Sequence, residues 1–169
     1  TGNWHLAERR WDEPGLIPGD DKIILKAARV VQWNQVTSVV DINQPSRVEI
    51  DFTVQKPVKN LLAGVNLYNE EGLCIFDTED WRPNEVHPGL YRRYVTIPAQ
   101  FLAEGYYSIL LQLHFYDPNV LSVLVRDALT FEAIDSDHPL AVRGLYRGGK
   151  WPGVVRVKLD WSEIINLSP

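Results

Sequence analysis

Hydrophobic and polar residues alternate with a period of two along two stretches near the middle of the chain, residues 91–97 and 107–116. In the second stretch every odd position from 107 to 115 is aromatic or aliphatic, whereas the even positions are mixed. Such alternation is typical of a strand with one face on a core and the other near solvent. Pro98 opens the connection between the two stretches. We expect them to pair with each other as antiparallel neighbours.

Further short strand patterns, separated by turn residues, occupy most of the remaining chain. No stretch shows the period of an amphipathic helix of normal length. Short strands at this spacing, without alternating helices, are typical of an antiparallel sandwich. We therefore predict an all-β fold, an antiparallel β-sandwich of immunoglobulin-like or jelly-roll-like type over residues 23–169, preceded by an irregular linker or extended arm over residues 1–22. The other expected strands are residues 23–33, 36–42, 48–55, 61–69, 73–77, 120–134 and 154–161.

Composition and charge indicate which kinds of partner the chain can bind. With 169 residues, 45% of them hydrophobic, the chain is long enough for one domain with its own core. The net charge of −5 argues against a nucleic-acid partner, because phosphate backbones are met by clustered Lys and Arg. The single cysteine, Cys74, excludes an internal disulfide, and we expect it to be an inert packing residue. The chain begins at Thr1 and contains no Met, so we expect that it was cut from a longer protein.

Motifs for catalysis or cofactor binding fail when they are tested. Residues 144–150 resemble a phosphate-binding loop, but Trp151 stands where Ser or Thr would hold magnesium, and a strand pattern follows where a helix is needed. The four histidines lack metal-ligand spacing. Carboxylate pairs such as Glu49 and Asp51 are interpreted as surface charge rather than as a glycosidase pair. We therefore expect no catalytic residue, no metal and no cofactor.

The mixed faces of the two central stretches suggest a ligand. If the stretches pair, Arg92 and Tyr94 share one surface with Gln112, His114 and Tyr116. Flat rings interleaved with hydrogen-bonding groups suit a polar ligand with apolar C–H faces, as a sugar has.

Three more residues extend this set. Asn66 and Tyr68 alternate with apolar neighbours and are expected to face away from the core, while Trp81 lies in an irregular loop, where binding residues are common. The predicted carbohydrate-binding residues are Arg92, Tyr94, Gln112, His114, Tyr116, Asn66, Tyr68 and Trp81.

The order of several short motifs is similar to that of a known family. They are Arg10-Trp11 with PGDDKIIL at residues 18–25, VNLYNEEG at residues 65–72 leading into IFDT at residues 75–78, and Ile97-Pro98 followed by FLAEGYY at residues 101–107. In these features the chain resembles the C-terminal carbohydrate-binding domain of the ATPase subunit of O-antigen polysaccharide ABC transporters, the Wzt type. The resemblance spans most of residues 10–134.

This resemblance implies a β-sandwich that recognises the terminal region of a lipid-linked polysaccharide in the cytoplasm, peripheral to the inner membrane. The implied partners are an upstream nucleotide-binding domain, where any ATPase activity would reside, and the membrane subunits of a transporter. It also implies a homodimer in which the last strand, about residues 153–161, is exchanged between protomers, with Gly148-Gly149 as a hinge.

Three hypotheses for function remain open. The first is a non-catalytic carbohydrate-binding module that selects a polysaccharide for export. The second is a structural or protein-interaction sandwich whose aromatic face meets another subunit, so that Tyr94→Ala and Tyr116→Ala would disturb assembly. The third is a glycoside-modifying enzyme, which would lose turnover when one carboxylate is removed.

Overall fold

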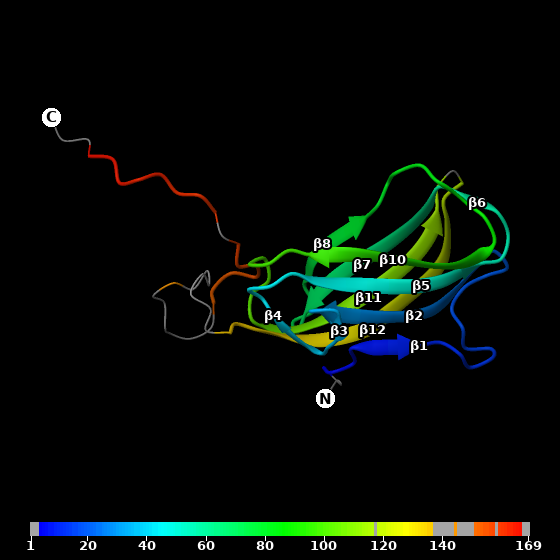
Figure 1. Ribbon diagram of the computed structural model, residues 1–169, viewed down its shortest axis with the longest axis horizontal. Coiled ribbons are helices and arrows are strands. Elements are labelled where there is room, and N and C mark those ends of the chain that lie inside the picture. The colour runs from blue at the N-terminus through cyan, green and yellow to red at the C-terminus, as the bar shows by residue number, and fades with distance from the viewer. Residues whose placement is uncertain (1–3, 117, 137–143, 145–150, 158, 167–169) are drawn as a thin grey trace.

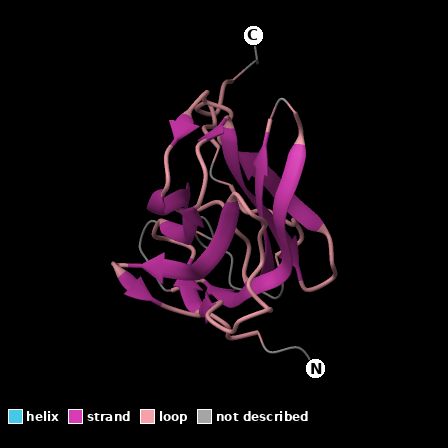
Figure 2. Ribbon diagram, turned by 90° about the vertical axis from the view of Figure 1, so that its right-hand side faces the viewer, coloured by secondary structure: helices cyan, strands magenta, loops and turns pink. Residues whose placement is uncertain are grey.

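The computed structural model describes residues 4–116, 118–136, 144, 151–157 and 159–166. Every regular element in these residues is a strand, and Figure 2 shows only strands and loops. None of them forms a helix suited to crossing a membrane. The strands are β1 (Glu8–Arg10), β2 (Ile23–Gln32), β3 (Gln35–Val36), β4 (Val39–Asp41), β5 (Ser46–Val54), β6 (Val58–Lys59), β7 (Leu61–Asn69), β8 (Cys74–Glu79), β9 (Glu85–Val86), β10 (Gly89–Ile97), β11 (Gly105–Phe115) and β12 (Val120–Ile134).

Two sheets pack face to face (Figure 1). Sheet A has the order β1-β2-β5-β10, with β3 paired to the end of β2, and sheet B has the order β4-β12-β11-β7-β8. Neighbouring strands are antiparallel except β4 and β12, which are parallel. A small separate ladder joins β6 to β9. The prediction of an all-β antiparallel sandwich is confirmed.

The core lies between the sheets and follows the alternation in the sequence. In β11 the odd positions from Tyr107 to Phe115 are all buried against it, as the period of two predicts. Sheet A contributes Val48, Ile50 and Phe52 of β5 to the same cluster. Burial of these faces leaves the even positions of β11 on the outside of sheet B.

The predicted pairing of the two central stretches is wrong. β10 pairs with β5 in sheet A, whereas β11 pairs with β7 and β12 in sheet B. The connection that opens at Pro98 therefore crosses from one sheet to the other instead of forming a hairpin. Arg92 and Tyr94 consequently lie on the outer face of sheet A, away from the outer face that carries Gln112 and His114.

The N-terminal arm is more regular than predicted. Residues Glu8–Arg10 form β1 against β2, and the backbone N of Val30 donates to the carbonyl of Ala7 at 2.8 Å. One residue earlier, the carbonyl of Leu6 accepts from the N of Thr130 in β12 at 3.0 Å. Trp11 is buried in the core. The arm therefore contacts both sheets.

The predicted last strand is not formed in the described part of residues 154–161. A single bridge joins Val155 to Leu102, and the N of Arg156 donates to the carbonyl of Phe101 at 2.9 Å. Beyond Val157 the described residues extend away from the sandwich (Figure 1), and the side chain of Trp161 is 92% exposed. The Gly148-Gly149 hinge and most of the glycine-rich loop at residues 144–150 lie outside the described residues.

Candidate functional site

The outer face of sheet B brings together most of the predicted site. Register places Gln112 beside Gly64 and His114 beside Leu62, while Asn66 and Tyr68 lie farther along β7, opposite Leu110 and Ser108 of β11. These residues alternate with core residues in both strands, so their side chains share the outer face.

A nearly buried carboxylate organises one end of this face. Glu79, the last residue of β8, accepts a hydrogen bond from Nε2 of Gln112 at 2.8 Å. The Nε2 atom of His114 lies 3.0 Å from the same oxygen, without the geometry of a hydrogen bond. Gly64 lies directly beneath Gln112, because a Cβ built on Gly64 would come within 2.5 Å of the Gln112 side chain.

Two rings form a corner above these polar groups. The rings of Trp81 and Tyr116 are 5.4 Å apart at an interplanar angle of 85°, and the ring of His114 lies 6.5 Å from that of Trp81. Trp81 is 59% exposed, so its ring is accessible to a ligand. We call Glu79, Trp81, Gln112, His114 and Tyr116 the Trp81 cluster.

Asp80 fixes the turn that carries Trp81. Its carboxylate accepts from the backbone N of Arg82 at 3.1 Å and from the Arg82 side chain, and it pairs with Arg93 of β10. The hydrogen bonds from Arg82 hold the pKa of Asp80 well below its usual value. Asp80, on one side of Trp81, is thus bonded to Arg82 on the other side and to Arg93 of the facing sheet.

Aromatic and polar groups continue toward the other end of the face. A pocket of about 230 Å³ is lined by Trp4, Tyr68, Ser108, Leu110 and Arg126, among others. Trp4, from the N-terminal arm, lies 5.6 Å from the ring of Tyr106. Asn66 lies between this pocket and the Trp81 cluster along β7. The face therefore presents two aromatic positions along the direction of the strands.

The remaining predicted residues lie elsewhere. Arg92 is held by Asp51, with its Nε 2.6 Å from Oδ1, and by Glu49 at 3.3 Å. Tyr94 projects from the outer face of sheet A, where the guanidinium of Arg47 lies 5.5 Å from its ring centre. Tyr94 approaches the other group only where it and Glu79 line one pocket, of about 280 Å³, between the open edges of β8 and β10.

The sequence patterns missed Glu79, Gly64 and Trp4. Glu79 could have been found by extending the alternation of β8 two residues beyond Asp77, where the predicted strand ended. Gly64 and Trp4 offered no comparable signal, because their roles depend on strand register and on the path of the arm.

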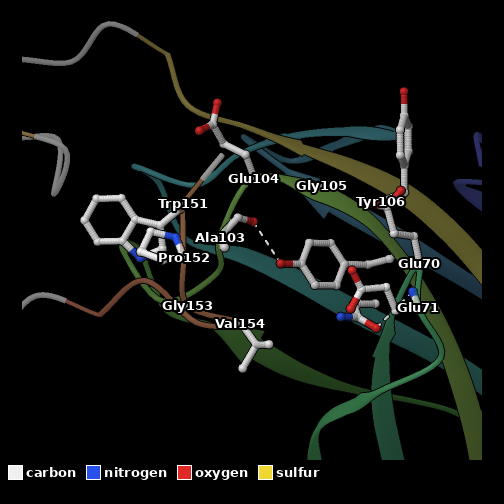
Figure 3. A pocket seen from close by; sticks show the side chains of 12 residues that line it. Glu70, Glu71, Ala103, Glu104, Gly105, Tyr106, Trp151, Pro152, Gly153 and Val154 are labelled. Carbon is white, nitrogen blue, oxygen red and sulfur yellow. Dashed lines mark hydrogen bonds between the residues drawn. The ribbon is translucent and has the colours of Figure 1, made fainter. Parts of the chain in front are cut away.

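A pocket of about 280 Å³ lies where the C-terminal segment joins the domain (Figure 3). Glu70 and Glu71 of the β7–β8 hairpin line one side, and Trp151 lines the other. The guanidinium of Arg156 lies 4.7 Å from the Trp151 ring centre, so this ring already has a cationic partner. This pocket therefore belongs to the junction and is a poor candidate for a sugar platform.

Other candidate chemistry finds structural explanations. Glu49 and Asp51 both contact Arg29 and Arg92, which explains them as ion-pair partners. Within the described residues, no group of three His, Cys, Asp or Glu side chains could hold a metal. Cys74 is exposed rather than packed, because it stands at the start of edge strand β8, which corrects the prediction of a packing residue.

Fold and site together define an antiparallel sandwich whose outer sheet face presents a corner of rings over hydrogen-bonding groups, a type of surface suited to a saccharide. The structure is similar to the crystal structure of the C-terminal domain of Wzt, with a TM-score of 0.64 and 13% sequence identity over 93% of this chain and 89% of that one. At this identity the likeness shows the fold, and it agrees with the family resemblance seen in the sequence. No protein-family model and no curated protein matches the chain.

Proposed function

We propose that the chain is a non-catalytic carbohydrate-binding module that recognises a lipid-linked O-antigen polysaccharide, at its terminal region, for export by an ABC transporter. The observation that carries the proposal is the Trp81 cluster, in which an exposed corner of rings stands above polar groups held by a nearly buried carboxylate. The likeness to the Wzt domain supports the proposed setting.

The corner of rings suits the shape of a sugar. The C–H face of the sugar stacks on Trp81. The ring of Tyr116, at an angle of 85° to Trp81, borders the edge of the sugar. Gln112 donates one amide hydrogen to Glu79, and its Oε1 has no hydrogen-bond partner among the described residues, so this oxygen accepts from a sugar hydroxyl. Asn66 and Tyr68 contact the next sugar units along the face.

A site on an open sheet face binds weakly, because few hydrogen bonds offset the desolvation of the sugar and the loss of motional freedom. A homodimer would present two such faces to one long polysaccharide and raise its retention by avidity. The described C-terminal segment offers exposed Leu159, Trp161, Ile164 and Ile165 as dimer contacts. In this proposal the module works in the cytoplasm, beside the nucleotide-binding domain and membrane subunits of the transporter.

Heteronuclear NMR tests the proposal. The chain is titrated with lipid-free O-polysaccharide from the source strain and, separately, with an unrelated polysaccharide. We expect the strain's own glycan alone to shift resonances of Trp81, Gln112, His114 and Tyr116. Trp81→Ala should weaken binding at least about tenfold, which corresponds to about 1.4 kcal/mol.

Leu90→Ala is the matched control, because Leu90 is also exposed but lies on sheet A. Absence of any shift at millimolar repeat units would refute the sugar-binding role. In that case, loss of assembly in Tyr116→Ala would favour the protein-interaction hypothesis instead.

A further inference from the structure

An exposed tryptophan occupies a strained turn on the opposite sheet. Trp33 and Asn34 are the two loop residues between β2 and β3, with φ angles of 50° and 59°. This is the geometry of a type I′ turn, which favours Asn-Gly. A bulky residue with positive φ is an outlier, because its Cβ crowds the backbone. The Trp33 side chain is 64% exposed, so packing within the described residues does not explain the choice of tryptophan.

A polar pocket opens beside this ring. Its volume is about 250 Å³, and its lining includes Trp33, Asn34, Gln44, Arg47 and Thr96. Amide, hydroxyl and guanidinium groups thus lie next to an accessible indole, and the Trp81 cluster on sheet B likewise combines an indole with an amide. Strained residues at an exposed position call for a functional explanation.

Two hydrogen bonds hold the Arg47 side chain in place. Its Nε donates to Oε1 of Glu49 at 2.8 Å, and its Nη2 donates to Oδ1 of Asn34 at 3.1 Å. The ring of Tyr94 lies under the same guanidinium at 5.5 Å. Nη1 has no hydrogen-bond partner among the described residues, so its two N–H groups remain for a bound molecule.

The charges around Arg47 indicate which ligand fits. Glu49, which pairs with Arg47, belongs to a network in which Arg10, Arg29, Arg47 and Arg92 contact Glu8, Glu49 and Asp51. The network carries four positive and three negative charges, and the Glu49 carboxylate lies directly against the Arg47 guanidinium, with its Oε1 2.8 Å from Nε. A ligand at the pocket therefore meets a directed donor whose charge is already paired with a carboxylate, which favours hydroxyl groups over an anion.

We propose that Trp33, Asn34 and Arg47 form a second saccharide-binding site, on sheet A, that takes a neutral sugar unit. The C–H face of the sugar stacks on the indole of Trp33, and Nη1 of Arg47 with Nδ2 of Asn34 donate to its hydroxyls. The strained turn holds the indole out from the sheet edge beside these donors. This inference does not rest on glycan binding by the Trp81 cluster.

The test uses the indole N–H resonances of Trp33 and Trp81, assigned with the variants Trp33→Gly and Trp81→Ala. Lipid-free O-polysaccharide from the source strain is added to the wild type and to Trp81→Ala, and dextran serves as the unrelated glycan. We expect the Trp33, Asn34 and Arg47 resonances to shift in both proteins with the first glycan only. Raising NaCl from about 0.05 to about 0.5 M should change this affinity less than about twofold, because the ligand is neutral.

Trp33→Gly should abolish these shifts and leave those at Trp81 intact. It should also melt at the same or a higher temperature, because glycine relieves the positive φ. Shifts at Trp33 without shifts at Trp81 would refute the function proposed for the Trp81 cluster and support the second site. Shifts at Trp81 alone would do the reverse.

The Trp33 site is also overturned if Trp33→Gly lowers the molar mass measured by light scattering. Figure 1 places the β2–β3 turn at the end of the sandwich where the C-terminal segment leaves, so a drop in mass would identify Trp33 as a contact between protomers.

Discussion

At the scale of single residues, Glu79 determines the geometry of the Trp81 cluster. One of its oxygens lies 2.8 Å from Gln112 Nε2 and 3.0 Å from His114 Nε2, so this residue of edge strand β8 contacts two side chains of β11, two strands away. Because a nearly buried carboxylate needs such partners, the three residues depend on one another. A ligand therefore meets side chains whose orientation is set before it binds, which lowers the entropy cost of binding.

Gly64→Ala tests this preorganisation. The added methyl group would come within 2.5 Å of the Gln112 side chain and displace it from Glu79. We expect glycan affinity to fall about tenfold, while the free energy of unfolding changes by less than about 1 kcal/mol. Isothermal calorimetry and urea unfolding measure the two quantities. Leu90→Ala is the control, because it leaves the strand geometry unchanged. Gly72→Ala is unsuitable, because φ of Gly72 is 78° and alanine would be strained there. Unchanged affinity in Gly64→Ala would contradict the role of Gln112.

A second prediction concerns acid stability. Burial alone would raise the pKa of Asp51, but hydrogen bonds from Arg92 and Arg29 outweigh burial and lower it below 3.8. The unfolded chain therefore binds this proton at higher pH than the folded one, so the stabilisation is present above about pH 4 and is lost as the pH falls below it.

Asp51→Asn should lower the free energy of unfolding at pH 7 by about 1–3 kcal/mol, because it weakens charged hydrogen bonds. Its stability should also fall less steeply than that of the wild type between about pH 4 and pH 2. Urea unfolding at several pH values gives both results. Parallel pH profiles for the two proteins would show that Asp51 does not contribute to acid lability.

At the scale of strands, alternation predicts which face of the sheet a residue occupies, but it does not predict which strands pair with each other. The odd residues of β11 were predicted to be core and are core, and the outward position of Gln112 and His114 followed from the same pattern. The partner of β10 was not predictable in this way, because antiparallel strands of two different sheets show the same period of two. Arg92 and Tyr94 were therefore assigned to the wrong surface, while Asn66 and Tyr68 were assigned to the right one.

Arg156 attaches the C-terminal segment to the sandwich. Its side chain is fully buried, with Nη2 2.6 Å from Oδ2 of Asp135 and Nη1 3.6 Å from Oε2 of Glu104. Arg156→Met removes the charge and leaves the nearly buried Asp135 with less compensation. We expect a loss of roughly 3 kcal/mol in the free energy of unfolding, the magnitude typical of a broken buried pair.

The double variant Arg156→Met with Asp135→Asn is the control, because it removes both charges. It should be more stable than Arg156→Met alone. Chemical denaturation measures both variants, and equal stabilities would exclude coupling between these two residues.

At the scale of the whole molecule, the exposed C-terminal segment is expected to mediate dimer formation. Leu159, Trp161, Ile164 and Ile165 are all strongly exposed in this segment, and exposed apolar residues that lie together mark interaction surfaces, because burial of apolar surface is favourable. The double variant Trp161→Ala with Ile164→Ala should convert a dimer into a monomer in light scattering at micromolar concentration. Leu16→Ala, which removes an apolar side chain of the arm that is 69% exposed, should leave the molar mass unchanged. A wild type that is monomeric at this concentration would exclude the proposed dimer.

The path of the N-terminal arm has a mechanical consequence. Leu6 is hydrogen-bonded to β12 of sheet B and Ala7 to β2 of sheet A, so two consecutive residues bind the two sheets of the sandwich. A displacement of the chain at residue 4 is therefore transmitted to both sheets, and the sandwich moves with the arm as one rigid body. We therefore expect the orientation of the proposed glycan-binding face to follow any movement of the arm.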